Sequence, residues 1–368
     1  MNVLIIGEYS GFAYNLKKGF EKLGHHVIVV QNGDGFKNIP SSGDDILYRK
    51  HCLHLFGKLI PQTARFMSWK VTREIKEAIL NKQLSFDLII LICDKFISKS
   101  LFTGAFPYSL LRQYKSNGAK IILATCGGDA AYCKYVKELP YYKTAYPKGV
   151  RKPTRHAIRK LCDIISLSDS IVPTAYDYYY TMSRFIEDEK LKAPLIKYIQ
   201  LPIEFEEICF NKHDKILVFH GLNRPIRKGT PFIKDALQKI SEKYGDIVDV
   251  VIDGKMPFEK YRKLMNDVDI IVDQTNSFGT GINAEMGLMK GKVVLGGNSI
   301  EERKLRGIES PIINIEPDVN MIFDVLESLI LDRKRLEELK IESREYALTH
   351  LRADIIAQQY IASVFSNS

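Results

Sequence analysis

The sequence predicts an α/β protein made of two Rossmann-like domains, and three observations support this prediction. The chain has 368 residues, about twice the length of a typical domain. Short apolar runs of strand length alternate with segments of helical periodicity, as in parallel βαβ units. This alternation begins a second time after the segment LPIEFEE at 201–207.

The N-terminal half begins with the apolar run VLIIG at 3–7. A segment of helical periodicity follows at 13–23, and Gly24 ends it before the next apolar run, HVIVV at 26–30. Strand, helix and strand in this order form one βαβ unit. The further elements expected in this half are strands at 87–93, 120–126 and 170–174 and a helix at 175–185.

The C-terminal half repeats the pattern independently. Its expected strands are 215–221, 248–254, 269–274, 293–297 and 311–315. Its expected helices are 230–244, with a proline in the first turn, 257–267 and 283–290. The last stretch, about 332–365, has helical character and no strand after it.

These elements predict an N-terminal domain at 1–205 and a C-terminal domain at 206–350. A last helix at 351–368 is expected to return to the N-terminal domain. Because no low-complexity segment separates the halves, we expect a short hinge. Two such domains commonly bind a ligand in the cleft between them, beyond the carboxyl ends of their strands.

Charge is distributed unevenly along the chain. Residues 1–205 contain 30 Lys and Arg against 18 Asp and Glu, whereas residues 206–368 contain 23 against 26. A basic N-terminal half is typical of a domain that meets anionic partners, although a solvated basic surface without a partner remains an alternative. The start of the chain predicts a strand and not a signal peptide, and the six cysteines form no C-x-x-C pair. We therefore expect a cytoplasmic protein.

The segment NSFGTGINAEMGLMKGKVVLGG at 276–297 follows an expected strand. Gly279 and Gly281 would let the backbone approach a ligand closely. The helix that begins near Ile282 and Asn283 would offer free N–H groups to an anion. Glu285 in its first turn could accept hydrogen bonds from a ribose diol, or could simply favour the helix dipole.

A second segment, HGLNRPIRKG at 220–229, joins another expected strand to a helix. It places Arg224, Arg227 and Lys228 at the carboxyl end of that strand. Such cations can compensate the charge of a departing diphosphate. The alternative is a solvated basic loop without a ligand. The glycine-rich segment that begins a helix in the same domain favours a phosphate-binding role instead.

Together with the N-terminal segment GEYSGFAYNLKKGFEKLGHHVIVV, these segments resemble the GT-B-type glycosyltransferases, and glycosyltransferase family 4 in particular. The resemblance covers most of the chain and is strongest at 215–300. It implies a retaining transfer of a sugar from a nucleotide-diphosphate sugar to a glycan or lipid-linked acceptor, in cell-surface polysaccharide synthesis. The donor would lie on the C-terminal domain and the acceptor on the N-terminal domain.

The resemblance also implies roles for single residues. Lys228, with Arg224 or Arg227, would neutralise the diphosphate, and Glu285 would bind the ribose. Backbone groups of Gly281, Ile282 and Asn283 would meet the phosphates or the sugar.

Other implied roles lie at the edges of the cleft. The loop that starts at Asp253 would face the base, and Gly11 would permit close approach of the first loop to the donor. ATCGGDAAY at 124–132 resembles the His-Gly-x-Asp element of the family without its histidine. Asp129 there could bind a hydroxyl of the sugar or acceptor, or could cap the next helix.

One position departs from the family pattern of two glutamates. Counting back from Glu285 places Ser277 where the first glutamate is expected, and serine supplies no carboxylate. A subfamily difference and a loss of transferase activity are both open explanations.

No metal-ligand spacing and no nucleophile–base pair is evident, so we expect a metal-independent enzyme without a cofactor. A sugar-nucleotide epimerase or hydrolase of the same fold and a non-catalytic nucleotide-sugar-binding protein remain alternatives. A nicotinamide oxidoreductase is disfavoured because neither half has G-x-G-x-x-G after its first strand. No nucleic-acid partner is expected, because no reader motif is present.

The segment at 48–79 interleaves cations with apolar residues, among them Trp69, and a second basic stretch lies at 148–160. Such a surface could contact an anionic membrane peripherally. An ordinary amphipathic helix that packs on the sheet explains the segment 48–79 equally well.

Overall fold

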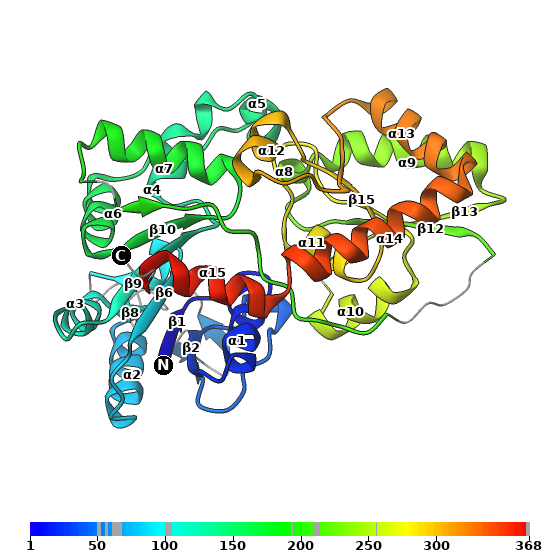
Figure 1. Cartoon of the computed structure of the whole chain (residues 1–368). Coiled ribbons are helices and arrows are strands. Elements are labelled where there is room, and N and C mark those ends of the chain that lie inside the picture. The colour runs from blue at the N-terminus through cyan, green and yellow to red at the C-terminus, as the bar shows by residue number, and fades with distance from the viewer. Residues whose placement is uncertain are drawn as a thin grey trace.

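The computed structural model describes residues 1–49, 68–99, 105–192, 194–208, 214–254 and 256–365, together with the backbone of 53–55 and 58–60. These residues form two α/β lobes that lie side by side (Figure 1). Each lobe is built on its own parallel sheet, as the alternation of strands and helices predicts.

The N-terminal lobe contains a seven-stranded sheet in the order β11-β10-β9-β6-β1-β2-β3. Its strands are β1 Asn2–Ile6, β2 His26–Gln31, β3 Ile46–Leu47, β6 Leu88–Ile92, β9 Lys120–Thr125, β10 Ser170–Pro173 and β11 Leu195–Ile196. Its helices are α1 Phe12–Lys22, α2 Ser68–Asn81, α3 Tyr108–Ser116, α4 Ala130–Tyr135, α5 Tyr142–Ala145, α6 Arg155–Leu167 and α7 Tyr176–Asp188. Two short pairs are added, β4 Leu53–Leu55 with β5 Lys58–Ile60 and β7 Ile97–Ser98 with β8 Phe106–Pro107.

The C-terminal lobe contains a five-stranded sheet in the order β13-β12-β14-β15-β16. Its strands are β12 Ile216–Gly221, β13 Val248–Asp253, β14 Ile270–Val272, β15 Val293–Gly296 and β16 Ile313–Asn314. Its helices are α8 Pro225–Lys228, α9 Thr230–Tyr244, α10 Phe258–Asp267, α11 Ile282–Met289, α12 Ile300–Arg306, α13 Val319–Leu331 and α14 Arg333–His350.

The strands are apolar because helices cover both faces of each sheet. All five residues of β6 and all four of β10 are buried. Helices such as α1 and α9 bury one stripe of apolar residues, whereas α11 is buried at seven of its eight positions. The expected helix at 230–244 is found at Thr230–Tyr244.

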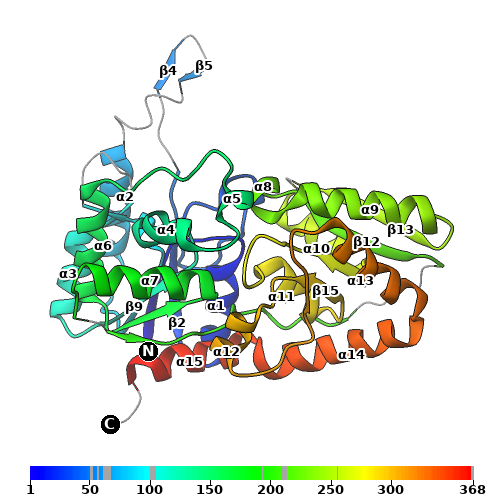
Figure 2. The ribbon, with the colours of Figure 1, turned by 90° about the horizontal axis from the view of Figure 1, so that it is seen from above.

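The last helix, α15 Ala353–Phe365, crosses back to the N-terminal lobe and packs on α1. Figure 2 shows α14 and α15 following one another along the molecule from one lobe to the other. A Cβ atom at Gly19 of α1 would lie 2.0 Å from the carbonyl oxygen of Ala353, so only glycine allows this close contact.

The stretch 332–365, expected to be helical, is found as two helices, and the second, Ala353–Phe365, lies within the last helix expected at 351–368. The break follows Leu351, where the chain pairs with the segment that links the lobes. Ile203 N donates to Leu351 O over 2.8 Å, and Ala353 N donates to Ile203 O over 2.9 Å. The chain therefore passes between the lobes twice, near Ile203 and near Leu351, and backbone hydrogen bonds join these two crossing segments.

No described helix combines the length and the apolar composition that a bilayer crossing requires.

Candidate functional site

A cleft of about 450 Å³ lies between the lobes, beyond the carboxyl ends of the strands of both sheets. Both lobes contribute to its walls. The residues predicted for the site that line it are Arg224, Arg227, Lys228, Asp253, Ser277, Gly281, Ile282 and Asn283. The predicted residues that line the cleft therefore come together in space from three separate segments between residues 224 and 283.

The basic loop follows β12 and leads through α8 into α9. Arg224 has φ 57°, a left-handed conformation that is uncommon for a residue with a side chain, and Gly229 ends α8 with φ 73°. A Cβ at Gly229 would lie 1.9 Å from the Thr275 hydroxyl oxygen. Glycine thus brings this loop into contact with the loop that follows β14.

Lys228 points into the contact between these two loops. Its Nζ lies 2.6 Å from Oδ1 of Asp273, and Oδ2 of the same carboxylate accepts a hydrogen bond from Gly281 N over 3.2 Å. Asp273 is 2% exposed, whereas Lys228 borders the cleft. The ammonium is held at the beginning of α11 by a buried carboxylate.

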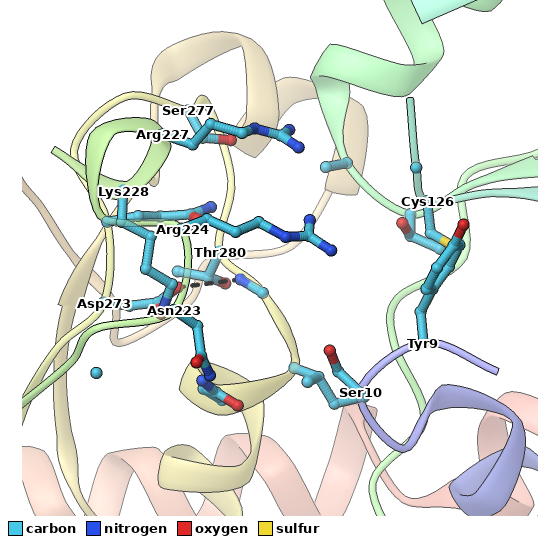
Figure 3. Close-up of a pocket in the computed structure, with 18 of the residues that line it drawn as sticks. Tyr9, Ser10, Cys126, Asn223, Arg224, Arg227, Lys228, Asp273, Ser277 and Thr280 are labelled. Carbon is cyan, nitrogen blue, oxygen red and sulfur yellow. Dashed lines mark hydrogen bonds and ion pairs between the residues drawn. The ribbon is translucent and has the colours of Figure 1, made fainter. Parts of the chain in front are cut away.

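Arg224 forms no ion pair with the described residues and is exposed within the cleft. Figure 3 shows its side chain reaching across the gap from the C-terminal lobe toward Tyr9 and Cys126 on the opposite wall. A guanidinium in this position can meet a bound anion without first breaking an internal pair.

Arg227 also extends from the C-terminal lobe, but it enters a group of aromatic rings from the N-terminal lobe. Its guanidinium carbon lies 5.5 Å from the ring centre of Tyr132 and 5.3 Å from that of Tyr146. It donates to the Tyr132 hydroxyl over 3.3 Å, and Tyr178 is a further hydrogen-bonding partner. Cation–π contacts therefore join the two lobes at this end of the cleft.

The loop 276–281 carries the predicted glycines. Gly281 precedes α11 and lines the cleft with Ile282 and Asn283. Gly279 is not among the lining residues. Its missing side chain makes room for the carboxylate of Glu302, since a Cβ there would lie 2.9 Å from Glu302 Cδ.

Glu285 lies in the first turn of α11, as predicted, but the structure places it beneath the loop and not among the residues that line the cleft. It is 7% exposed, and its Oε1 accepts from the Thr280 hydroxyl over 3.1 Å. Its Oε2 has no hydrogen-bond partner in the described residues. Burial raises the pKa of Glu285 to about 7, although the Arg306 guanidinium acts in the opposite direction.

Ser277 contacts the opposite lobe. Its hydroxyl donates to Oδ2 of Asp177 over 2.5 Å. The neighbouring Asn276 accepts from the Thr144 hydroxyl over 3.1 Å. The loop 276–279 is thereby joined to the beginning of α7 and to the end of α5.

The remaining predicted residues lie at the edges of the cleft. Gly11 adopts φ 94° before α1, and its N–H donates to the buried carboxylate of Glu8 over 2.7 Å; its neighbours Ser10 and Phe12 line the cleft. Asp253 ends β13 and lines the cleft. Asp129 is buried outside the lining and caps α4, accepting from Tyr132 N over 2.7 Å. Burial raises its pKa to about 7.

Several residues of the cleft were not identified from the sequence. Among them are Asp177, Asp273 and the rings of Tyr132, Tyr146 and Tyr178. The run YDYYY at 176–180 is an unusual concentration of polar aromatic residues and could have drawn attention. Asp273 follows its strand directly, in the position where polar ligand-binding residues are common.

Within the described ranges, no three His, Cys, Asp or Glu side chains converge into a group that could hold a metal ion. In the segment 48–79, for which a membrane contact is one interpretation of the sequence, Val71, Ile75 and Ile79 of α2 are buried and Trp69 is 42% exposed. The side chains of 50–67 lie outside the described residues.

Comparison with protein-family models and with curated proteins gives no match. Solved structures do match over the whole chain. A sucrose-phosphate synthase from Thermosynechococcus elongatus superposes with a TM-score of 0.60 at 15% identity, covering 98% of this chain and 96% of that chain. HepE from Anabaena, crystallised with UDP and glucose, gives 0.59 at 12% identity and covers all of both chains.

A glycosyltransferase from Rickettsia africae gives a TM-score of 0.57 at 12% identity, covering 100% of this chain and 99% of that one. A putative UDP-N-acetylglucosamine 2-epimerase from Listeria monocytogenes gives 0.51 at 8%, covering 100% and 97%. The chain therefore has the GT-B fold, with two Rossmann-like domains that face each other across a cleft.

Proposed function

We propose that the chain is a retaining glycosyltransferase that moves a sugar from a nucleotide-diphosphate sugar to a glycan or lipid-linked acceptor in cell-surface polysaccharide synthesis. One observation carries the proposal. Arg224, Arg227 and Lys228 line one wall of the interdomain cleft beside Gly281 at the beginning of α11. Cations beside the first turn of a helix, whose N–H groups point toward the same space, can stabilise a departing diphosphate.

The proposed roles follow from this geometry. Arg224 meets the diphosphate directly, because no described carboxylate neutralises it. Lys228 approaches from the side, and Asp273 holds its ammonium at the edge of the cleft. Fixed cations then stabilise the leaving group without a metal ion. The backbone of Gly281, Ile282 and Asn283 faces the phosphates or the sugar.

We keep the predicted role of Asp253 and revise the roles of Glu285 and Asp129. Asp253 borders the cleft and is proposed to lie beside the base. Glu285 can reach a ribose only if the loop above it moves, since its carboxylate is buried under Thr280. For Asp129 we propose a positioning role, because its carboxylate holds the beginning of α4 behind the cleft wall.

For a retaining reaction we propose that the leaving phosphate takes the proton of the acceptor hydroxyl on the same face of the sugar. The hydroxyl oxygen forms the new bond to the anomeric carbon as the bond from that carbon to the phosphate oxygen breaks. The acceptor then lies against the N-terminal wall, which includes Tyr9 and Gly127.

A thermal-shift screen against UDP-, GDP-, ADP- and CMP-linked sugars tests the donor class. We expect stabilisation by one nucleotide, and a shift that is lost in Lys228→Ala and retained in Lys234→Ala, an exposed lysine on α9. Stabilisation by none of the four classes would contradict the proposal, and so would stabilisation by the CMP-linked sugar alone, because that donor contains no diphosphate.

A sugar-nucleotide epimerase or hydrolase is the second candidate, supported by the similarity to the Listeria structure. A non-catalytic nucleotide-sugar-binding protein is the third, suggested by Ser277. Incubation with the donor alone separates them. An epimerase or hydrolase changes the donor without acceptor, a transferase requires the acceptor, and a binding protein leaves the donor unchanged in both cases.

We also propose that the basic N-terminal lobe contacts an anionic membrane surface peripherally. The exposed cations Lys148, Arg151, Lys152, Arg155 and Arg159 support this. Co-sedimentation with phosphatidylglycerol vesicles at low salt is expected, and with phosphatidylcholine vesicles it is not. Failure to bind either kind would exclude the membrane contact and leave the transferase proposal standing.

A further inference from the structure

Asp177 is a buried carboxylate in the wall of the cleft that no sequence motif identified. It lies in the first turn of α7 in the N-terminal lobe and is 7% exposed. Its Oδ2 accepts from the Ser277 hydroxyl of the other lobe over 2.5 Å, and the backbone N–H of Phe278 is a further donor. Two groups of the C-terminal lobe therefore orient a side chain of the N-terminal lobe.

Three carboxylates line the cleft in the described part of the chain, and their surroundings differ. Asp273 is neutralised by Lys228 and also accepts from Gly281 N. Asp253 is exposed at the end of β13 and accepts from its own neighbour, Gly254 N, over 2.6 Å. Asp177 alone of the three is both buried and without an ion pair to a described cation.

The position of Asp177 relative to the phosphate-binding groups suggests what it recognises. Ser277, its partner, lies four residues before Gly281 in the same loop, and Arg227 is close enough to favour the charged form of the carboxylate. A ligand whose diphosphate lies at Arg224 and Gly281 would carry its glycosyl group toward the N-terminal lobe. A carboxylate there can accept hydrogen bonds from sugar hydroxyls, which pair well with a charged acceptor.

We propose that Asp177 is the residue that recognises the hydroxyls of the glycosyl group, and that Ser277 sets its orientation from the opposite lobe. The inference rests on the proposed function and adds a specificity-determining residue to it. It also gives Ser277 a role that a glutamate could not perform, because serine donates a hydrogen bond to Asp177 and an ionised glutamate only accepts. The recognition of the sugar is thereby coupled to closure of the two lobes.

Calorimetric titration with UDP and with UDP-glucose separates the glycosyl contact from the nucleotide contact. In Asp177→Asn we expect the affinity for UDP within twofold of wild type and the affinity for UDP-glucose roughly tenfold lower. In Ser277→Ala, which leaves the carboxylate in place, we expect a smaller loss with the same selectivity. Thr144→Ala is the matched control, because it removes another hydrogen bond between the lobes without altering a lining residue.

Three results would overturn the inference. If Asp177→Asn lowers the affinities for UDP and UDP-glucose equally, the carboxylate acts only in closure of the lobes. Unchanged binding of both would show that the carboxylate meets no ligand. A Thr144→Ala variant as selective as Ser277→Ala would assign the effect to closure. A wild-type protein that binds neither UDP nor UDP-glucose, and none of the other nucleotide-diphosphate sugars of the thermal-shift screen, would instead contradict the proposed function, and with it this inference.

Discussion

The Lys228 ammonium and the buried Asp273 carboxylate form an ion pair of 2.6 Å at the edge of the interdomain cleft. The pair has two consequences, one for stability and one for ligand binding. Removal of the lysine leaves Asp273 buried and without its cation, which is costly in an environment of low polarity. The same change removes one of the cations proposed to meet the diphosphate.

We therefore expect Lys228→Met to lower the free energy of unfolding by about 3 kcal/mol in urea denaturation. The double variant Lys228→Met/Asp273→Asn should recover most of that loss, since a neutral amide needs no cation. Its affinity for UDP should stay low. Recovery of both stability and binding in the double variant would refute the assignment of Lys228 to the phosphate site.

The hydrogen bond between Ser277 and Asp177 predicts the effect of restoring the glutamate that the family resemblance implies. Ser277→Glu places a second carboxylate beside a buried one, so the variant should be less stable than wild type by about 1–3 kcal/mol. Burial already raises the pKa of Asp177 to about 6.

The destabilisation by Ser277→Glu should be larger at pH 8, where both carboxylates are ionised, than at pH 5, where they can share a proton. Thermal unfolding at the two pH values measures this. Addition of Asp177→Asn should remove the pH dependence, and a Ser277→Glu protein as stable as wild type at pH 8 would contradict the prediction.

Gly19 offers a test of the helix that crosses between the lobes. Helix propensity alone predicts that Gly19→Ala stabilises α1 by up to about 1 kcal/mol. The contact with Ala353 predicts the opposite, because the added Cβ would lie 2.0 Å from a carbonyl oxygen and α15 would have to shift. We expect a net loss of about 1–3 kcal/mol and faster proteolysis within 353–365. Lys18→Ala on the same helix serves as control, and a gain in stability for Gly19→Ala would show that α15 does not pack there in solution.

The pKa of Glu285 predicts how stability depends on pH. Its pKa of about 7 in the folded protein lies above the ordinary value of 4.5, so the folded state binds this proton more tightly than the unfolded state. The resulting stabilisation is fully present below about pH 4.5 and is lost as pH rises through about 7. Relative to Glu285→Gln, wild type should lose up to about 3 kcal/mol between pH 5 and pH 8.

Urea denaturation of both proteins across this pH range measures the difference in their free energies of unfolding. The contributions of the other titrating groups cancel in this difference. Glu187→Gln, an exposed carboxylate on α7, should show no such trend. A constant difference between wild type and Glu285→Gln would mean that Glu285 is ionised in the folded protein. A loop that opens and exposes this carboxylate to a ribose would produce that result.

The order of elements and the existence of two lobes follow from local patterns. Apolar runs of strand length and helical stripes are properties of neighbouring residues, so β1, α1, β12 and α9 are found where periodicity places them. The segments at 220–229 and 276–297, which we propose to bind phosphate, could also be singled out, because each combines a strand end with cations or glycines within a few residues. Burial is less visible in sequence, and the placement of Glu285 beneath the loop had no local signal.

The sequence by itself determined the two βαβ systems and the cationic and glycine-rich loops at their strand ends, since these depend on spacing along the chain. Only the tertiary structure decided that Asp177 meets Ser277, that Arg227 enters the rings of Tyr132 and Tyr146, and that α15 reaches Gly19. Each of these contacts joins residues at least 80 positions apart. These contacts depend on how the two lobes and the last helix pack against each other. The periodicity of a single segment carries no information about that packing.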